Sequence, residues 1–392
     1  MRKAVIVSAT RTPIGSFQGA LSPISATKLG SIAIARALKK LDLPADQVDE
    51  VLMGNVLSAG LGQAPARQAA LGAALPNSVA CTTVNKVCGS GLKAVMLAAQ
   101  AIDTGDADVV IAGGMESMSN APYLLMKGRM GYRLGSGELV DSLIHDGLWD
   151  VYNQFHMGAA GEICARMLKI SREEQDEYAV ISYERARQAQ EKNAFAREIV
   201  AVNVPNGSLE DVIVAEDEEP KRFNGSNLHS LRPAFEKHGS ITAGNASSIS
   251  DGAAALVVMS DEKAQILGLN PMARIIGFTT YATEPAWFTT APAKAIQALL
   301  RRTDRSVAEV DLFEINEAFA VGSIAVNREL GLDINKVNVR GGAVALGHPI
   351  GASGARVLTT LIHALEDLDL ATGVASLCIG GGEAVAMMIE RV

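Results

Sequence analysis

The chain has 392 residues, of which 48% are hydrophobic and 20% charged, and its formal net charge is −8 at pH 7. This length exceeds what one hydrophobic core usually supports, so we expect two domains or two fused halves. The negative charge gives no reason to expect nucleic acid or an anionic membrane as a partner.

The cysteine pattern and the hydropathy limit the class of protein further. The 4 cysteines form no Cys-x-x-Cys pair and no zinc-ligand spacing, so we expect a reducing compartment and no bound metal. No apolar run is long enough to cross a bilayer. Together these features predict a soluble cytoplasmic protein.

Strand and helix patterns alternate from residue 4 to residue 114. Apolar runs and helical spacing predict strands at 4–9, 48–55, 80–84 and 109–114, and helices at 26–41, 65–75 and 92–102. This alternation predicts an α/β fold with a largely parallel sheet.

The central feature of this region is Cys88, in the segment Val-Asn-Lys-Val-Cys-Gly-Ser-Gly at 84–91. The helix that follows has Lys93 as its one charged residue, so we expect it to be buried on all sides. A cysteine at a helix N-terminus meets unpaired N–H groups and the positive end of the macrodipole, which favour a thiolate. Free cysteine is also among the most buried residue types. This segment alone therefore supports a nucleophile and a structural cysteine equally.

The pattern loosens between residues 115 and 244, where we predict an inserted subdomain that carries loops. Ser171 and Glu174 form a capping box that opens a polar helix running to about Lys192. An acidic run at 216–219 reads as a solvated face and suggests no function of its own. Binding residues are commonly displayed on loops of this kind.

Beyond residue 250 the first half recurs. Segments 310–316, 351–354 and 378–383 parallel 48–54, 88–91 and 111–116 in the same order, each displaced by roughly 260 to 270 positions. Duplication of one α/β unit predicts a helix–sheet–helix–sheet–helix sandwich with a pseudo-twofold axis and a buried helix from each half at its centre. We expect an N-terminal half at 1–118, completed by about 245–265, an inserted loop subdomain at 119–245, and a C-terminal half at 266–392.

The duplication also relates three candidate chemical groups. The turns at Cys88 and Gly351 begin equivalent helices, so His348 could face Cys88 and accept its proton, although the turn alone could explain an ordered histidine. Cys378 follows a strand at 374–377 and precedes three glycines, which is expected to expose the sulfur and to offer N–H groups to an oxyanion. Cys81 and Cys164 lack such surroundings, and we interpret them as core residues.

Motifs spread over nearly the whole chain match one enzyme family in the family's own order. They include Asn-Lys-Val-Cys-Gly-Ser-Gly at 85–91, Gly-Gly-Met-Glu-Ser-Met-Ser at 113–119, Asn-Glu-Ala-Phe-Ala at 316–320 and Cys-Ile-Gly-Gly-Gly at 378–382, with further matches at 156–158, 242–247, 341–343 and 347–354. The chain resembles the thiolase family, and most of all its bacterial acetyl-CoA acetyltransferase branch. The resemblance implies a five-layered αβαβα sandwich.

The resemblance also implies a set of catalytic roles. Cys88 would take the acetyl group of acetyl-CoA with His348 as its base, and Cys378 would remove the α-proton of a second acetyl-CoA. Asn316, through a water, and His348 would stabilise the thioester oxyanion of that second molecule. The N–H groups of Cys88 and Gly380 would hold the tetrahedral oxyanion on the nucleophile.

By the same resemblance the substrates are acetyl-CoA, acetoacetyl-CoA and CoA, with no cofactor, and the assembly is a homotetramer with the basic loop at 126–133 as a candidate contact. The family often has an arginine after the acidic run, near the CoA nucleotide, where this chain has Pro220 beside Lys221 and Arg222; Arg222 is the candidate cation. Residues matching the pantetheine and acyl pocket are His156, Met157, Phe235, Ala243, Ser247, Phe288, Ala318 and Phe319.

Three alternatives remain open at this point. One is degradative 3-ketoacyl-CoA thiolysis, which is the same chemistry in reverse on longer chains. The acyl-carrier-protein condensing enzymes share the layered fold and a Cys–His site but lack a second catalytic cysteine, so Cys378 argues against them. A CoA- or lipid-binding relative without activity is disfavoured by the joint presence of Cys88, Asn316, His348 and Cys378.

Overall fold

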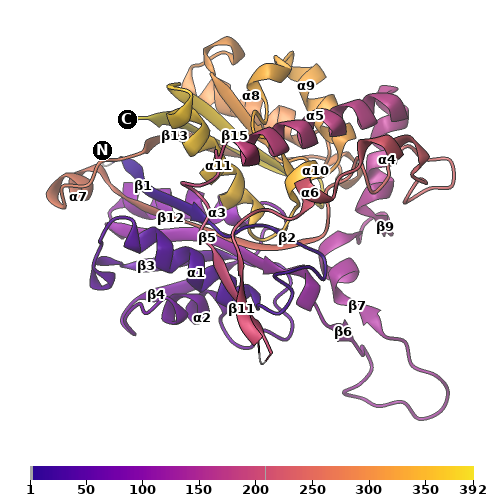
Figure 1. Cartoon of the computed structure of the whole chain (residues 1–392), viewed down its shortest axis with the longest axis horizontal. Helices are drawn as coiled ribbons and strands as arrows, with labels where there is room; N and C mark the ends of the chain where they lie inside the picture. The colour runs from indigo at the N-terminus through magenta and orange to yellow at the C-terminus, as the bar shows by residue number, and fades with distance from the viewer. Residues whose placement is uncertain (1–2, 208) are drawn as a thin grey trace.

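The computed structural model describes residues 3–207 and 209–392 of the chain. A sheet runs through the centre of the molecule (Figure 1) in the order β14-β15-β16-β13-β1-β12-β5-β3-β4, and β2 pairs with β12. Its strands are β1 (Ala4–Arg11), β2 (Gly15–Ser16), β3 (Glu50–Gly54), β4 (Ala80–Val84), β5 (Val109–Ser117), β12 (Ser250–Ser260), β13 (Ala273–Ala282), β14 (Leu312–Ile315), β15 (Thr372–Ile379) and β16 (Glu383–Arg391).

The prediction of a largely parallel sheet is wrong, because the sheet is mixed. Parallel pairing is confined to β3 with β4, β3 with β5 and β14 with β15. The strands between these pairs run antiparallel, including β1 with both β12 and β13. For β15 and β16 the reason is their connection, a glycine turn at 380–382, because antiparallel neighbours need only such a tight turn, whereas parallel neighbours need a crossover.

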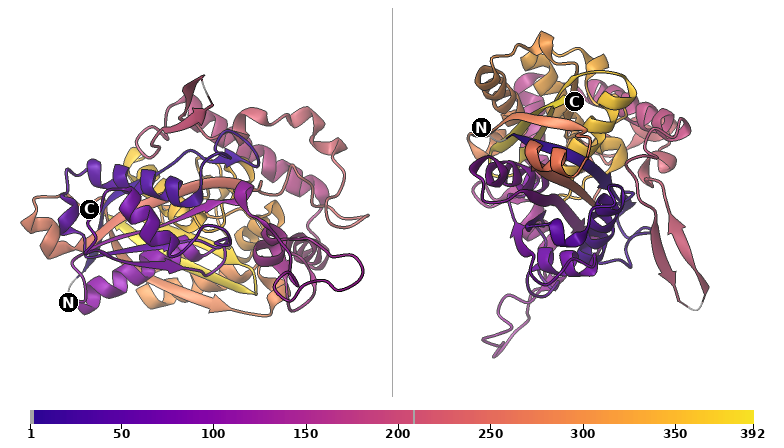
Figure 2. Two further views of the ribbon diagram at one scale, coloured as in Figure 1. Left: turned by 90° about the horizontal axis from the view of Figure 1, so that it is seen from below. Right: turned by 90° about the vertical axis from the view of Figure 1, so that its left-hand side faces the viewer.

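The sheet has one part on the β4 side and one part on the β14 side of its centre. Helices cover the outer faces of both parts and fill the space between them (Figure 2). The outer layer of the first half is α1 with α2, the central layer is α3 with α11, and α8 covers the far face of the second half with α9 against it. Their bounds are α1 (Ala26–Lys39), α2 (Pro65–Gly72), α3 (Ser90–Thr104), α8 (Ala291–Thr303), α9 (Ala320–Leu330) and α11 (Ser353–Asp367). The predicted five-layered sandwich is confirmed.

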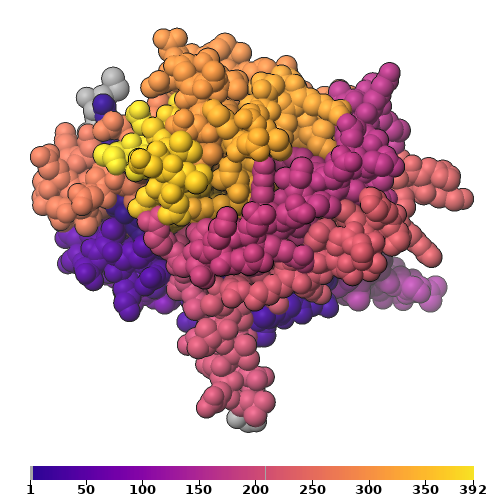
Figure 3. All heavy atoms as spheres, turned by 45° about the horizontal axis from the view of Figure 1, so that its top comes forward, coloured from indigo at the N-terminus to yellow at the C-terminus, as the bar shows by residue number. Residues whose placement is uncertain are grey.

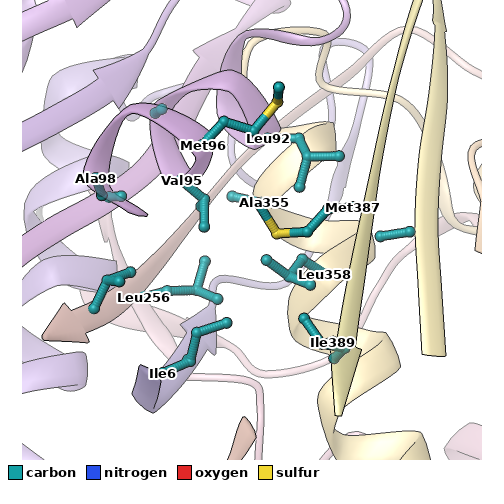
Figure 4. Close-up of a cluster of buried hydrophobic side chains, with 14 of the residues drawn as sticks. Ile6, Leu92, Val95, Met96, Ala98, Leu256, Ala355, Leu358, Met387 and Ile389 are labelled. Carbon is teal, nitrogen blue, oxygen red and sulfur yellow. The ribbon is translucent and has the colours of Figure 1, made fainter. Parts of the chain in front are cut away.

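The central core lies between α3, α11 and the two parts of the sheet (Figure 4). Leu92 and Val95 of α3 face Leu358 of α11, with Leu256 and Met387 supplied by the sheet, and burial of each such side chain contributes about 1.5–3 kcal/mol. The two helices start in close contact. A Cβ added at Gly91 would lie 2.7 Å from the Ala355 nitrogen, and one at Gly354 would lie 2.2 Å from the Leu92 nitrogen. Glycine at both positions therefore lets the two helix starts touch.

The expectation that the cysteine-bearing helix is buried on all sides is wrong in one respect. Lys93 and Leu97 of α3 are half-buried and Gln100 is exposed. These residues recur at helical spacing and therefore form one stripe. The rest of α3 packs against α11 and the strands of the sheet.

The segment between β5 and β12 projects from the sandwich. It holds β6 (Tyr123–Leu124), β7 (Val140–Asp141), β8 (Trp149–Asp150), β9 (Phe155–His156), α4 (Met157–Leu168), α5 (Arg172–Glu191), β10 (Val202–Asn206), β11 (Leu209–Val214) and α6 (Glu219–Arg222). The predicted capping box of α5 is present, with Ser171 and Glu174 each bonded to the other's backbone N–H. The β10–β11 hairpin protrudes from the body (Figure 3), and the β6–β7 loop extends away from it in Figure 1.

A buried ion network anchors this segment to the sheet. The Arg11 guanidinium at the end of β1 bonds Glu198 at 2.6 Å and Asp217 at 2.7 Å, and all three side chains are fully buried. Because removing one partner of such a network leaves uncompensated buried charge, it holds the segment firmly to the sandwich. The short helices α7 (Asp261–Ile266) and α10 (Ala343–Leu346) complete the fold. Within the described residues, no helix is both long and apolar enough to cross a membrane.

Candidate active site

The turn that carries Cys88 connects β4 to α3 and is held by short hydrogen bonds. The Ser90 hydroxyl accepts from the Lys86 N–H at 2.8 Å and donates to the Val87 carbonyl at 2.6 Å. Asn85 Oδ1 accepts from the Val87 N–H at 3.0 Å. Val87 has a φ of +45°, which a β-branched residue adopts only when its surroundings force it. These hydrogen bonds therefore hold the turn in a strained conformation that places Cys88 just before α3 begins.

Cys88 is a thiol at neutral pH in this environment. Burial raises its pKa to about 11, and the backbone N–H groups of Gly380 and of Cys88 itself, directed at the sulfur, lower it only in part. The expected effect of backbone N–H groups is present and lowers the pKa, but desolvation outweighs it, so the net shift disfavours the thiolate. Ionisation of this sulfur requires a base.

His348 is a neutral imidazole on the turn after α10. Burial, and to a smaller extent the charge of Arg356, lower its pKa to about 3. The backbone N–H of His348 donates to the Ser248 carbonyl at 3.1 Å, and the imidazole Nδ1 lies 2.6 Å from the Ser353 hydroxyl. Asn316 Nδ2 lies 3.4 Å from the same ring nitrogen. A neutral imidazole has one nitrogen that can accept a proton.

Cys88 and His348, which come from different halves of the chain, line one pocket of about 450 Å³. Gly380 lines it as well. So do all of the residues predicted for the pantetheine and acyl pocket, namely His156, Met157, Phe235, Ala243, Ser247, Phe288, Ala318 and Phe319. The structure thus brings into one cavity groups predicted from separate motifs.

Aromatic rings form one wall of this pocket. His156 stacks on Phe235 with ring centroids 4.7 Å apart, and Phe235 meets Phe319 edge to face at 5.9 Å. Phe288 meets the other side of Phe319 at 6.4 Å. Burial lowers the pKa of His156, and its Nδ1 accepts the Gly158 N–H at the start of α4. The wall therefore combines apolar surface with an uncharged histidine.

Cys378 and Asn316 lie behind the pocket rather than on its lining. Both face a small cavity of about 10 Å³ that shares Ala318 and Phe319 with the main pocket. Cys378 is 5% exposed and belongs to one buried cluster with Met157 and Phe288, so the expectation of an exposed sulfur is wrong. Burial and the neighbouring Cys88 raise the pKa of Cys378 far above its usual range. The two sulfurs are therefore close enough to influence each other.

The structure leaves Arg222 off the pocket lining. Its guanidinium is 62% exposed and lies 3.5 Å from the Glu219 carboxylate, which does line the pocket. Sequence reasoning missed Glu219, because an acidic run ordinarily marks a solvated face. It also missed six lining residues that lie in the matched motifs or directly after one of them, and that position could have indicated them. They are Met118, Thr242, Ala246, Ser248, Ile249 and Ile350. Gly147, Leu148 and Ala234 line the pocket without any signal in the sequence.

Comparison with known proteins now decides the family. The model of the thiolase N-terminal domain matches residues 4–262, and that of the thiolase C-terminal domain matches residues 269–391. The chain belongs to the thiolase family. It is therefore an acyltransferase with the thiolase fold.

Individual thiolases are similar over essentially the full length. Acetyl-CoA acetyltransferase 2 of Arabidopsis thaliana is 55% identical over 391 residues, covering 99% of this chain and 97% of that protein. A probable acetyl-CoA acyltransferase of Staphylococcus aureus is 49% identical and covers 100% of both chains. The crystal structure of the Bacillus anthracis acetyl-CoA acetyltransferase superposes with a TM-score of 0.98 at 42% identity, covering 100% of this chain and 99% of that one.

Proposed function

We propose that this thiolase is an acetyl-CoA C-acetyltransferase, which condenses two acetyl-CoA molecules to acetoacetyl-CoA and CoA and catalyses the reverse thiolysis. Support comes from one pocket that holds Cys88, the neutral His348 and backbone N–H groups directed at the Cys88 sulfur, with a second buried thiol, Cys378, close behind it. Similar proteins that are named for this activity add to that support.

In the first half-reaction the Cys88 sulfur attacks the thioester carbonyl carbon while His348 takes the thiol proton. Because the thiol has a pKa of about 11 and the imidazole one of about 3, this transfer is unfavourable in the resting protein and must accompany bond formation. The N–H groups of Cys88 and Gly380 are suited to hold the tetrahedral oxyanion. CoA thiolate leaves, and acetyl-Cys88 remains.

In the second half-reaction Cys378 acts as the base. Its buried thiol gives its proton to the departing CoA thiolate, and the resulting Cys378 thiolate is strongly basic because burial disfavours the charge. It takes the α-proton of a second acetyl-CoA, whose carbanion attacks acetyl-Cys88. Asn316, through a water, and His348 stabilise the oxyanion of this carbanion. Cys88 leaves as thiolate and recovers its proton from His348, so the cycle balances.

The assembly proposed from the family resemblance is a homotetramer. The β6–β7 loop supports this assignment because it displays apolar side chains to solvent, among them Met126, Met130 and Leu134, the last being 100% exposed. Apolar surface of this kind commonly marks a protein–protein contact. Arg222 at the pocket rim remains the proposed partner of the CoA nucleotide, where it would have to leave Glu219.

Mass spectrometry of the intact protein tests the proposal. Incubation with acetyl-CoA should add one acetyl group, mapped by peptide analysis to Cys88, and acetoacetyl-CoA should accumulate in the solution. The variant Cys88→Ala should take up no acetyl group and lose condensation by several orders of magnitude. Acetylation that persists in this variant, or wild-type protein that never acetylates, would overturn the proposal.

A further inference from the structure

Two carboxylates occupy equivalent places in the internal repeat, and the proposed reaction uses neither. Glu116 ends the segment 111–116 in β5, and Glu383 ends the matching segment 378–383 at the start of β16. Each carboxylate bonds one residue from the half of the chain to which it does not itself belong. The two contacts fall on the two turns that carry Cys88 and His348.

Glu116 is fully buried and accepts four hydrogen bonds, with no Lys or Arg among its partners in the described part of the chain. Three come from the turn after β3: Asn55 Nδ2 at 2.8 Å, the Val56 N–H at 3.1 Å and the Leu57 N–H at 3.2 Å. The fourth comes from the second half of the chain, from the Gly351 N–H at 2.9 Å. Gly351 belongs to the turn that begins at His348.

The first half also encloses the other side of the Gly351 peptide. A Cβ added at Gly54 would lie 2.7 Å from the Gly351 carbonyl oxygen, one at Gly91 3.1 Å and one at Gly114 2.1 Å. Three glycines of the first half therefore surround this carbonyl so closely that a side chain at any of them would crowd it. With the N–H bonded to Glu116, both polar groups of the Gly351 peptide are fixed by the opposite half.

Glu383 makes the corresponding contact in the other direction. Its carboxylate forms an ion pair with Lys86, two residues before Cys88, and the two side chains are 34% and 21% exposed. Glu383 is paired with Ile379 in the hairpin that carries Cys378 and Gly380. The ion pair therefore connects the Cys88 turn directly to the hairpin whose Gly380 N–H approaches the Cys88 sulfur.

We propose that Glu116 and Glu383 are reciprocal positioning residues, each fixing the active-site turn carried by the opposite half of the molecule. The role rests on the proposed function, since it concerns the alignment of Cys88, His348 and the Gly380 N–H. The contacts matter for rate because the reacting groups sit on separate halves, and a displacement of about 1 Å can cost a hundredfold. Neither carboxylate lines the pocket or the small cavity behind it that holds Cys378 and Asn316, so neither is placed to touch substrate.

The partly exposed ion pair offers the cleanest test. We would compare Lys86→Met, Glu383→Gln and the charge-exchanged double variant Lys86→Glu with Glu383→Lys. The control is Lys294→Met, which removes an ion pair with Glu329 away from the pocket, in which the lysine is more exposed than Lys86 and the carboxylate similarly exposed, 49% and 31%. Single-turnover acetylation by acetyl-CoA and kcat should each fall about tenfold or more in the single variants, with KM within about twofold. The exchanged pair should recover most of the rate, and the control should match the wild type.

Glu116→Gln tests the buried contact with a side chain of the same shape. Its amide places an NH₂ group against backbone N–H donors, so the Gly351 turn should loosen and acetylation should slow by about tenfold or more. Acetylation at the wild-type rate in this variant and in both single variants of the ion pair would overturn the proposal. A loss of rate that follows the loss of thermal stability, without recovery in the exchanged pair, would also overturn it.

Alkylation of Cys88 by iodoacetamide separates failure of this proposal from failure of the proposed function. The reaction needs no acetyl-CoA, and a sulfur displaced from the Gly380 N–H should alkylate more slowly in Lys86→Met than in Lys294→Met. If the two variants differ in alkylation rate as expected but the wild-type protein never takes up an acetyl group, the result contradicts the proposed function alone. Equal alkylation rates in the two variants contradict the positioning role.

Discussion

The Ser353 hydroxyl determines which nitrogen of His348 is free to act as a base. It lies 2.6 Å from Nδ1 of the imidazole and 2.9 Å from the Pro349 carbonyl oxygen. A carbonyl can only accept, so the single hydroxyl proton goes to Pro349, and the hydroxyl oxygen accepts from an Nδ1–H. The neutral imidazole therefore carries its proton on Nδ1, and Nε2 holds the lone pair needed to accept the Cys88 proton.

The variant Ser353→Ala should slow acetylation because it removes the partner that selects this tautomer. We expect the single-turnover rate to fall about ten- to a hundredfold, less than the loss caused by removing a general base altogether. Stopped-flow or quenched-flow acetylation with acetyl-CoA measures it. Thr359→Val is the matched control, because Thr359 is buried on the same helix and its hydroxyl has no hydrogen-bond partner among the described residues. Equal rates in the two variants would show that Ser353 does not orient the base.

The pKa values at the site predict how Cys88 reacts in the absence of substrate. Burial raises the pKa of Cys88 to about 11 and lowers that of His348 to about 3, so both groups are neutral between these values. The reactive thiolate should therefore increase about tenfold per pH unit from pH 7 to pH 9. Iodoacetamide labelling of Cys88, quantified by peptide mass spectrometry, measures this. A labelling rate that is flat above pH 6 would instead indicate a preformed thiolate–imidazolium pair.

Cys378→Ala should separate the two half-reactions. The variant should still form acetyl-Cys88, because Cys88 is the attacking thiol, His348 is its base, and CoA can leave as a thiolate. It should fail to condense the acetyl group, with a loss of several orders of magnitude, because no base remains for the α-proton. Exchange of the acetyl methyl protons with deuterium in the solvent, followed by NMR or mass spectrometry, should fall in parallel. Normal condensation would return Cys378 to a structural role.

The fold could be predicted from the sequence to the extent that local patterns determine it. The layers, the buried helix from each half and the capping box of α5 followed from hydrophobic spacing and from the repeat. The direction of the central strands could not be predicted, because β12 joins the sheet only after the long inserted segment. Strand pairing of that kind depends on tertiary contacts that no local pattern records.

The site was predictable in its members but less so in its electrostatics. Motif positions correctly placed Cys88, His348 and Gly380 around one pocket. The helix N-terminus suggested a thiolate at Cys88, whereas burial by distant segments gives the opposite shift of its pKa. Cys378 was expected to be exposed by its glycines, yet it is buried in a cluster with Met157 and Phe288. Burial is a property of the whole fold, and sequence spacing alone does not supply it.

Phe288 underlies the last prediction, which concerns substrate size. Its ring is 3% exposed and packs in one cluster with Met157, Ala318 and Cys378, and its edge meets Phe319. We predict that acetoacetyl-CoA is cleaved better than 3-ketoacyl-CoAs of eight or more carbons. An open pocket gains about 1–3 kcal/mol for each buried methylene, whereas here each added methylene must displace packed side chains.

The measurement is kcat/KM for thiolysis across chain lengths of four to twelve carbons. It should fall with length in the wild type, and Phe288→Ala should flatten the profile by opening space beside Phe319, with condensation of two acetyl groups retained. Trp287→Ala is the control, since Trp287 neighbours Phe288 but does not line the pocket. A 2-methyl-branched substrate is informative in the same series, because the ring could either shorten the pocket or leave room beside itself for a branch. A pocket closed by Phe288 cannot accept long chains without displacing packed side chains. A flat or rising wild-type profile would therefore contradict this prediction and favour degradative 3-ketoacyl-CoA thiolysis.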